Sequence, residues 1–293
     1  MTDNKKYGVI DVGSNSVRAM LYSGGKILYT DLIITRLGEG LIFTGKLSEI
    51  AMERTAAAVF SFADKLKSGG ADEVFTFATE AVRSASNSSV FIEKIAKTGL
   101  SLDVVGGDEE GELGLIGALG GKDGAVIDIG GASAEIVAAK NGKIIYSHSL
   151  PLGAVRLHDM CGEDELKLAA KIDEKLGEYG VLPKSAYTAV GGTATALCVV
   201  AKGFDGFTEE RVNGQFLTVE EISSALEKIK ACPLEERERK LKISQKRAEI
   251  IYGGATLLYR ILTRFSIDKI KISTDDNLVG YIRKKIYGEG YLK

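Results

Sequence analysis

The sequence predicts an α/β protein made of two similar domains, and two observations lead to this class. First, a segment occurs twice without a gap, because the stretch from Val9 to Tyr29 is repeated from Val126 to Tyr146 at a constant offset of 117. Second, β-branched apolar segments alternate with helical patterns along the rest of the chain, as in layered α/β proteins. An ungapped internal match is the signature of a duplicated unit, so we expect one copy in each domain.

Each copy of the repeat has the pattern of a strand, a loop of small residues and a hairpin. An apolar strand runs into Asp-x-Gly, and a second and a third strand follow around a glycine turn. Small residues let backbone N–H groups face an anion at close range, so a duplicated phosphate loop implies two domains facing each other across a cleft. Two ordinary hairpins with turn-forming Gly and Ser are the alternative. The candidate phosphate ligands are Gly13, Ser14, Asn15 and Ser16 in the first copy and Gly130, Gly131, Ala132 and Ser133 in the second.

The remaining elements are marked by hydrophobic periodicity and capping residues. In the first half they are a long helix that begins after Ser48 and stops at Gly69, a strand leaving into a loop over residues 73–83, a helix at about 88–97, a short strand at 101–105 and a turn that opens a helix over 106–119. In the second half they are a helix at about 164–178, a strand over 185–190 that runs into a helix over 191–202, one long helix over 244–265, a strand over 269–274 and a terminal helix. We therefore expect domains of residues 1–122 and 123–293, with a C-terminal tail that could pack back onto the first.

The composition indicates a globular protein in a reducing compartment. A chain of 293 residues, 45% hydrophobic and 27% charged, is long enough for two ordinary domains. The formal net charge of −2 gives no general attraction to a polyanion, so phosphate must be bound by local Lys and Arg, and we expect no DNA partner. Three widely spaced cysteines without a CxxC pair predict neither a disulfide nor a zinc site. No signal-peptide pattern and no apolar run of transmembrane length occur, so we expect a cytoplasmic protein without a membrane partner.

Nine short motifs follow one another along nearly the whole chain: DVGSNSVR, TRLGEG, FATEAVRSASN, GGDEEGEL, DIGGASAE, LPLGAVRL, VGGTATAL, RVNG and QKRAEIIYGGA. Together they resemble the exopolyphosphatase/guanosine pentaphosphate phosphatase (Ppx/GppA) family, of the short, two-domain type. The resemblance implies the superfold of actin, Hsp70 and sugar kinases. The expected fold class is therefore α/β, with two actin-like (ribonuclease H-like) domains and an inter-domain cleft.

The resemblance also implies roles for acidic residues in the hydrolysis of phosphoanhydride bonds from a chain end. Glu110 stands where the family has its proposed catalytic base, although a solvated acid in a first helical turn would read the same way. Asp128 and Glu135 stand where the family holds Mg²⁺, with Mn²⁺ as the alternative ion. Asp11 is the counterpart of Asp128 in the first copy and is the third candidate metal ligand. Because Arg18 replaces Glu135 there, cation chemistry is expected mainly at the second loop.

Basic residues and a second glycine turn complete the expected site. Arg83 matches the family's substrate-facing arginine and could clamp a phosphoryl group. Gly191, Gly192 and Thr193 follow an apolar strand at the start of a helix, which suits an anion, with a purely structural turn as the alternative. Arg247 coincides with the family's arginine before its long helix, so it is expected to contact the polyanion. Most other basic residues between 237 and 247 are expected to be a solvated face.

The sequence departs from the family pattern in two of the motifs. The family's Glu-Glu-Ala-Arg becomes Glu-Glu-Gly-Glu, which places Gly111 and Glu112 after the proposed base, and GGGSTE becomes GGASAE. Ala132 would be strained if its position required a positive φ. These departures bear on catalytic rate and chain-length preference.

The substrate expected from the resemblance is inorganic polyphosphate, from which terminal phosphate would be removed. The main alternative is the 5′ γ-phosphate of guanosine pentaphosphate. A non-hydrolytic sensor of polyphosphate or alarmones and a small-molecule kinase on the same superfold are further alternatives. By analogy with the family, a homodimer is expected.

Overall fold

The computed structural model of the chain describes residues 5–288, apart from the side chain of Lys246. It divides into two compact units, residues 1–110 (unit 1) and 111–293 (unit 2). Helix α5 (Gly107–Leu119) carries the chain across this division. The boundary expected from the sequence, between residues 122 and 123, lies at the other end of the same helix.

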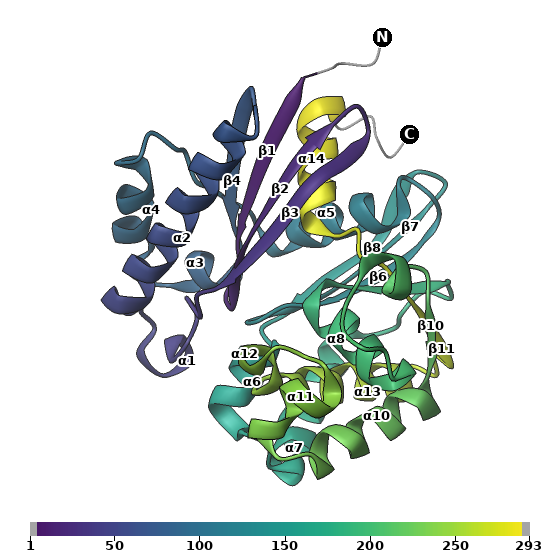
Figure 1. Cartoon of the computed structure of the whole chain (residues 1–293). Helices are drawn as coiled ribbons and strands as arrows, with labels where there is room; N and C mark the ends of the chain where they lie inside the picture. Colours follow the sequence, from purple (N-terminus) through teal and green to yellow (C-terminus); the bar gives the residue numbers. More distant parts are fainter. Residues whose placement is uncertain (1–4, 289–293) are drawn as a thin grey trace. The chain divides into compact units, whose positions relative to one another are not determined.

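Unit 1 is built around one five-stranded mixed sheet in the order β3-β2-β1-β4-β5 (Figure 1). Its strands are β1 (Lys6–Val12), β2 (Ser16–Ser23), β3 (Lys26–Ile34), β4 (Glu73–Ala78) and β5 (Asp103–Val104). Its helices before α5 are α1 (Leu41–Thr44), α2 (Glu49–Ser68), α3 (Glu80–Ser84) and α4 (Ser88–Ala96). Strand β1 pairs antiparallel with β2 and parallel with β4.

Helix α2 confirms the prediction of a long helix between Ser48 and Gly69. The Ser48 side chain accepts a hydrogen bond from the backbone N–H of Ala51 at 3.2 Å, which satisfies one of the unpaired donors of the first turn. Gly69 is the C-cap. Val59 and Phe62 on the inner face are fully buried in the core that α2 forms with the sheet.

Unit 2 contains a six-stranded mixed sheet in the order β10-β11-β9-β6-β7-β8. Its strands are β6 (Gly124–Ile129), β7 (Ala134–Lys140), β8 (Lys143–Leu150), β9 (Tyr187–Val190), β10 (Phe216–Thr218) and β11 (Lys269–Ile272). Its helices are α6 (Ala154–Cys161), α7 (Glu165–Leu176), α8 (Gly191–Lys202), α9 (Glu209–Val212), α10 (Val219–Ala231), α11 (Arg237–Leu241), α12 (Gln245–Ala248), α13 (Ile251–Arg264) and α14 (Asn277–Tyr287).

The two sheets have the same topology, which confirms that the repeated sequence marks a structural duplication. Strands β8-β7-β6-β9-β11 follow one another as β3-β2-β1-β4-β5 do, with the same pattern of parallel and antiparallel neighbours. The two sheets also share one irregularity in the pairing of their strands. The register between the second and third strands shifts at Leu21/Tyr22 in unit 1 and at Ala138/Ala139 in unit 2, positions related by the same offset of 117. The α/β class predicted from the sequence is therefore confirmed.

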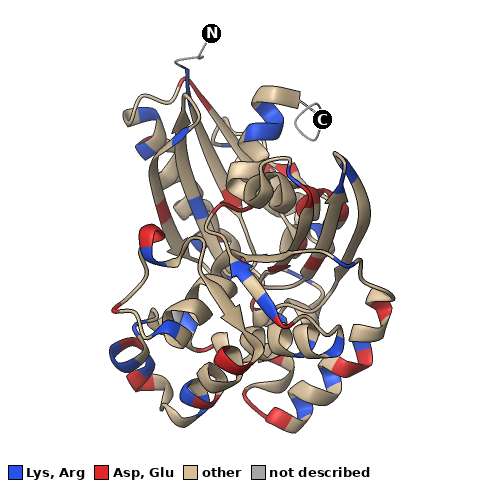
Figure 2. Cartoon of the chain, turned by 90° about the vertical axis from the view of Figure 1, so that its right-hand side faces the viewer, with Lys and Arg blue, Asp and Glu red and all other residues tan. Residues whose placement is uncertain are grey.

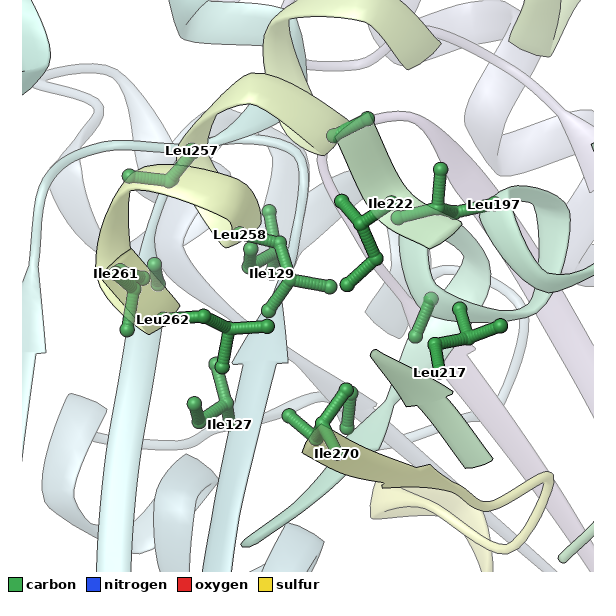
Figure 3. Close-up of a cluster of buried hydrophobic side chains, with 14 of the residues drawn as sticks. Ile127, Ile129, Leu197, Leu217, Ile222, Leu257, Leu258, Ile261, Leu262 and Ile270 are labelled. Atoms are coloured by element: carbon green, nitrogen blue, oxygen red, sulfur yellow. The ribbon is translucent and has the colours of Figure 1, made fainter. Parts of the chain in front are cut away.

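The core of unit 2 lies between its sheet and the helices α8, α10 and α13. Figure 3 shows Ile127 and Ile129 of β6 beside Leu258 and Leu262 of α13, with Leu197 of α8 nearby. Ile127 and Ile129 point to this core, and since side chains alternate along a strand, Asp128 points to the opposite face. That face is the one on which Leu115 of α5 packs.

Two helices differ from the prediction. The long helix expected over residues 244–265 is broken into α12 and α13, because Glu249 and Ile250 form a turn between them. Helix α10 was not predicted, although its start carries a capping box. The hydroxyl of Thr218 accepts from the backbone N–H of Glu221, and the Glu221 carboxylate accepts from the Thr218 N–H.

Charged residues of both signs are spread over the surface. In the view of Figure 2, segments of Lys and Arg alternate with segments of Asp and Glu along the helices. This agrees with the small net charge and leaves phosphate binding to particular basic residues. Among the residues that the structure describes, no helix is both long and apolar enough to cross a lipid bilayer.

Candidate functional site

Asp128 and Glu135 lie side by side at the end of the first hairpin of unit 2. They are directly opposite each other in the antiparallel register of β6 and β7, so their side chains share one face of the sheet. Both are buried, at 8% and 2% exposure. Ser149 on β8 donates a hydrogen bond to Oε1 of Glu135 at 2.7 Å. Burial, together with the nearby charge of Glu135, raises the pKa of Tyr179 well above its ordinary value.

In unit 1 the equivalent pair consists of an acid and a base. Asp11 is opposite Arg18 in the register of β1 and β2. Arg18 donates from Nε and Nη2 to Oδ2 of Asp11 at 3.0 and 2.5 Å. The first copy thus neutralises its aspartate with an internal cation, whereas the second copy places two acids at the same positions. The expectation that the two loops are chemically different is met by this geometry.

The two phosphate loops close with the same hydrogen bond. The N–H of Gly13 donates to the carbonyl of Ser16 at 3.0 Å, and the N–H of Gly130 donates to the carbonyl of Ser133 at 3.0 Å. Each loop is also held by the segment that follows its third strand. In unit 1 the N–H of Gly38 donates to the carbonyl of Ser14 at 2.8 Å.

In unit 2 the loop is held by the start of α6. The N–H of Val155 donates to the carbonyl of Gly131 at 2.8 Å, and Nε of Arg156 donates to the carbonyl of Ala132 at 2.8 Å. The side chain of Arg156 therefore supports the loop. The structural repeat therefore extends beyond the residues whose sequence is repeated, because in both units the segment after the third strand of the hairpin holds the loop.

Asn15 carries a buried amide in the first loop. It is 7% exposed, and neither its amide nitrogen nor its amide oxygen has a hydrogen-bond partner among the described residues. Leaving such groups unsatisfied costs about 1–3 kcal/mol. The arrangement agrees with the prediction of Asn15 as a donor in the first phosphate loop, which stays a prediction.

The Gly191-Gly192 turn lies against both Asp128 and Arg247. Gly191 has φ +80°, and a Cβ there would lie 2.7 Å from Oδ1 of Asp128. A Cβ on Gly192 would lie only 2.0 Å from Nη1 of Arg247. Only glycine at these two positions leaves room for the side chains of Asp128 and Arg247 to lie so close to the backbone. The structure therefore joins three elements that the sequence could place only separately: the end of β6, the start of α8 and helix α12.

Thr193 is held within unit 2 by its side chain, and its role at an anion site stays a prediction. Its hydroxyl donates to the carbonyl of Ile129 at 3.0 Å and so ties the start of α8 to the end of β6. No side chain caps α8 within the described chain. The backbone N–H groups of its first turn, rather than the Thr193 hydroxyl hydrogen, are therefore the donors that could face an anion.

Arg237 is an exception to the solvated face expected for most of the basic stretch, whose residues Arg239, Lys240 and Lys242 are exposed. Its side chain is 2% exposed and pairs with both carboxylate oxygens of Glu163, at 2.7 Å from Nη2 to Oε2. Its Nη1 also donates to the carbonyl of Ala248 at 2.8 Å, the residue that follows Arg247. Arg239, in contrast, has a side chain 73% exposed. Sequence reasoning missed Arg237 because charge alone does not reveal which arginine of a cluster is buried.

Arg83 and Glu110 are brought together within unit 1. Glu110 is 6% exposed at the start of α5, whereas Glu109 is half-buried. Nη1 of Arg83 lies 3.4 Å from Oε2 of Glu110 and donates to the carbonyl of Val105 at 2.6 Å, while Nη2 pairs with Glu80. The choice of Glu110 over Glu109 agrees with this geometry. The sequence did not reveal that Glu80 holds the arginine from the other side.

The departures from the family pattern have structural causes. A Cβ on Gly111 would lie 2.2 Å from Cγ2 of Val137, so alanine does not fit there. Glu112 forms an ion pair with Lys284 on α14 at 2.7 Å. Ala132 is absent from the described non-glycine residues with positive φ, so the strain considered for it does not arise.

The fit of a divalent cation rests on the acidic pair of unit 2. Mg²⁺ prefers oxygen ligands and is usually held by one or two carboxylates, with water and substrate phosphates completing its shell. Asp128 and Glu135 supply such a pair in a buried place, and a cation bound beside them would stabilise the ionised form of both. Among residues 5–288 no cluster of three or more His, Cys, Asp or Glu side chains has the geometry of a complete metal site. The residues therefore suit an ion that substrate helps to hold. Asp11, engaged by Arg18, stays a prediction as a third ligand.

Comparison with known proteins identifies relatives over nearly the whole length. The model of the "Ppx/GppA phosphatase family" matches residues 22–275, which confirms the family resemblance seen in the motifs. "Exopolyphosphatase 2" of Mycobacterium tuberculosis is 28% identical over 94% of this chain and 97% of its own length. The crystal structure of the Ppx/GppA family member from Aquifex aeolicus has a TM-score of 0.79 at 27% identity, covering 97% of this chain and 98% of that one.

One relative is a larger protein. The bifunctional 3-dehydroquinate synthase/phosphatase of Fusobacterium nucleatum is 28% identical over 93% of this chain. The chain spans 45% of that protein's length.

Proposed function

Because this chain belongs to the Ppx/GppA phosphatase family, we propose that it is an exopolyphosphatase, which releases orthophosphate from the end of inorganic polyphosphate. The reaction is proposed to depend on Mg²⁺, with Mn²⁺ as a substitute, and to take place in the cytoplasm. The polyphosphate substrate is suggested by the name of the relative that this chain covers almost completely, exopolyphosphatase 2.

The observation that carries the proposal is the convergence of charges around the Gly191-Gly192 turn of unit 2. Asp128 meets this turn at Gly191 and Arg247 meets it at Gly192. Glu135 stands beside Asp128. Acids suited to a cation, an arginine suited to a phosphoryl oxygen and the open N-terminus of α8 are thus neighbours within one unit. A phosphoanhydride chain with its counter-cation is the kind of ligand that uses all three.

The chemistry requires a water molecule to attack the terminal phosphorus while the bridging P–O bond breaks. The proton of the attacking water goes to Glu110, and the electrons of the broken bond stay on the oxygen of the shortened chain. Such hydrolysis depends mainly on positioning and charge neutralisation. Arg83, held between Glu80 and Glu110, would orient the base.

Asp128 and Glu135 are the residues that would hold Mg²⁺. The ion would neutralise charge on the phosphate oxygens when bound. Arg247 and the N–H groups at the start of α8 would bind the chain beside it, and Asn15 and the loop of unit 1 would supply further donors.

The structural causes of the motif changes favour a hydrolase over a non-hydrolytic sensor. Gly111 and Glu112 are explained by packing on Val137 and by the ion pair with Lys284. Neither change removes the proposed base or the acidic pair. A sensor would need no buried base next to an arginine, which unit 1 retains.

Phosphate release from the purified protein tests the proposal. The substrates are polyphosphate, guanosine pentaphosphate and ATP, each with Mg²⁺ and with EDTA. We expect release from polyphosphate that requires the metal and proceeds until short chains remain. Preferential release from guanosine pentaphosphate would assign that substrate instead, and tight binding of polyphosphate without any release would assign a sensor.

A further inference from the structure

The first residue of helix α14 contacts the acidic pair of unit 2. The side-chain amide of Asn277 donates from Nδ2 to Oδ2 of Asp128 at 3.1 Å. Both side chains are buried, Asn277 at 3% exposure. A hydrogen bond to an ionised acceptor in such surroundings is stronger than one between neutral groups. Oδ1 of the same aspartate lies at Gly191.

The amide oxygen of Asn277 shows that packing alone does not explain an asparagine at this position. Its Oδ1 has no hydrogen-bond partner among the described residues and faces Gly114 of α5, where a Cβ would lie 3.0 Å away. An unsatisfied buried amide oxygen is unfavourable, so an apolar side chain of the same size would pack at less expense. The donor directed at Asp128 is what asparagine provides and leucine does not.

The segment that carries Asn277 is fixed on both sides. The N–H of Ser273 donates to the carbonyl of Ala189 on β9 at 3.0 Å, two residues before Gly191. The side chain of Asp276 caps α14 by accepting from the N–H of Leu278 at 3.1 Å. Asn277 therefore starts the helix from a defined position next to the glycine turn.

Helix α14 is also fastened to α5. Gly280 lies against the carbonyl of Leu113, where a Cβ would come within 1.8 Å. Nη1 of Arg283 donates to the carbonyl of Gly117 at 2.9 Å, and Lys284 pairs with Glu112. These contacts hold the helix in place independently of Asn277. The asparagine amide is therefore not needed to position the helix.

We infer that Asn277 is a positioning residue for Asp128 in the proposed reaction. Its N–H holds Oδ2, so that the carboxylate keeps one orientation and Oδ1 stays at the Gly191 turn, where cation and phosphate would meet. Partners of metal-binding carboxylates act in this way, and their loss typically lowers metal affinity by about ten- to hundred-fold. The inference rests on the proposed function, since it assumes that Asp128 holds the cation.

The test measures Mn²⁺ binding by calorimetry, with the whole chain and without turnover. Titrations are made with Mn²⁺ alone and in the presence of inorganic phosphate. We expect the Kd for Mn²⁺ to rise roughly ten- to hundred-fold in Asn277→Leu. Lys284→Ala is the matched control on the same helix, because it removes the ion pair with Glu112 and leaves Asn277 in place. Its Kd should equal that of the wild type. Asn277→Ala replaces the leucine variant if the latter does not fold.

A second readout separates positioning from a damaged fold. Phosphate release by Asn277→Leu should need more Mg²⁺ and should recover as Mg²⁺ is raised, because the carboxylates that hold the ion are still present. A variant with a disturbed fold would lose activity at every Mg²⁺ concentration.

Three results would overturn the inference. The first is an equal Kd for Mn²⁺ in the wild type and the Asn277 variant. The second is a Kd that rises as much in Lys284→Ala as in the Asn277 variant. The third is a wild type that binds no Mn²⁺, either alone or with inorganic phosphate. A wild type that binds Mn²⁺ but releases phosphate from no substrate would refute the proposed function instead. The role of Asn277 would then be decided by the binding data alone.

Discussion

The guanidinium of Arg247 lies directly on the Cα of Gly192. A Cβ at this glycine would come within 2.0 Å of Nη1 and 2.3 Å of Cζ. The contact joins a glycine turn and an arginine that are far apart in the sequence into one candidate anion site. The contact can be tested with one substitution, because the methyl group of an alanine at residue 192 must displace the guanidinium of Arg247.

Gly192→Ala should therefore resemble Arg247→Ala. We expect each to raise the KM for polyphosphate roughly ten-fold, which is about 1.4 kcal/mol of binding. Because both changes remove the same interaction, the double variant should be no worse than either single one. Steady-state kinetics of the three variants measure this coupling.

Arg239→Ala is the control for this cycle. It removes an arginine from the same basic stretch, but one whose side chain is 73% exposed. It should change the KM little. Additive losses in the double variant would show that Gly192 and Arg247 act independently.

Glu110→Gln should lower kcat by roughly two to four orders of magnitude with little change in polyphosphate binding, because it removes the proton acceptor and keeps the shape. Glu109→Gln, a neighbour that is half-buried, should retain most activity. Rapid-quench measurement of phosphate release gives kcat, and binding is measured by filter retention of labelled polyphosphate. Comparable losses in both variants would argue against Glu110 as the base.

Asp128→Asn should raise the Mg²⁺ concentration needed for half-maximal activity by roughly ten-fold or more, because a neutral amide holds the ion less well than a carboxylate. Asp11→Asn should leave this Mg²⁺ midpoint close to that of the wild type, since Arg18 already engages Asp11. Activity is measured over a Mg²⁺ titration. A larger shift in the Asp11 variant would place the ion at the first loop.

Arg237→Met should destabilise unit 2, because it leaves Glu163 without the arginine that now pairs with it. Breaking a buried ion pair from one side costs about 3–5 kcal/mol, and the lower end applies here since the Glu163 side chain is 37% exposed. Urea unfolding followed by circular dichroism measures the loss, with Arg239→Met as the exposed control. Equal stability of the two variants would contradict the structural role of Arg237.

The sequence predicted the local elements well where capping residues and periodicity agree, as at Ser48 and Gly69. It also located the duplication, because a hairpin repeats at constant spacing. It did not predict the burial of Arg237 or the contact of Asn277 with Asp128. These depend on segments far apart in the chain, and a single sequence carries no signal for which residues of such segments meet.

The break between α12 and α13 has a similar origin. Its residues have no proline or glycine to end a helix, so the periodic pattern over 244–265 predicted one continuous helix. In the structure Arg237 binds the carbonyl of Ala248 just before the break. A tertiary hydrogen bond therefore competes with the helical one, which local sequence rules cannot anticipate.

The environment of Asp275 predicts how the stability of the protein depends on pH. Burial raises the pKa of its carboxyl group above the ordinary value, Asp276 adds to the shift, and Arg283 opposes it. A raised pKa in the folded state means that folding favours the protonated form. Between the unfolded and folded pKa values the native protein binds more protons, so this contribution to stability falls as the pH rises through that window.

Asp275→Asn should therefore raise the Tm at about pH 7, because it removes a buried charge that folding disfavours. The advantage over the wild type should shrink as the pH is lowered, because the native carboxyl group takes up its proton at a higher pH than the carboxyl group of the unfolded chain. Thermal unfolding of both proteins across this pH range measures the difference. A variant that is less stable than the wild type at neutral pH would show that the ion pair with Arg283, at 3.8 Å, outweighs the effect of burial.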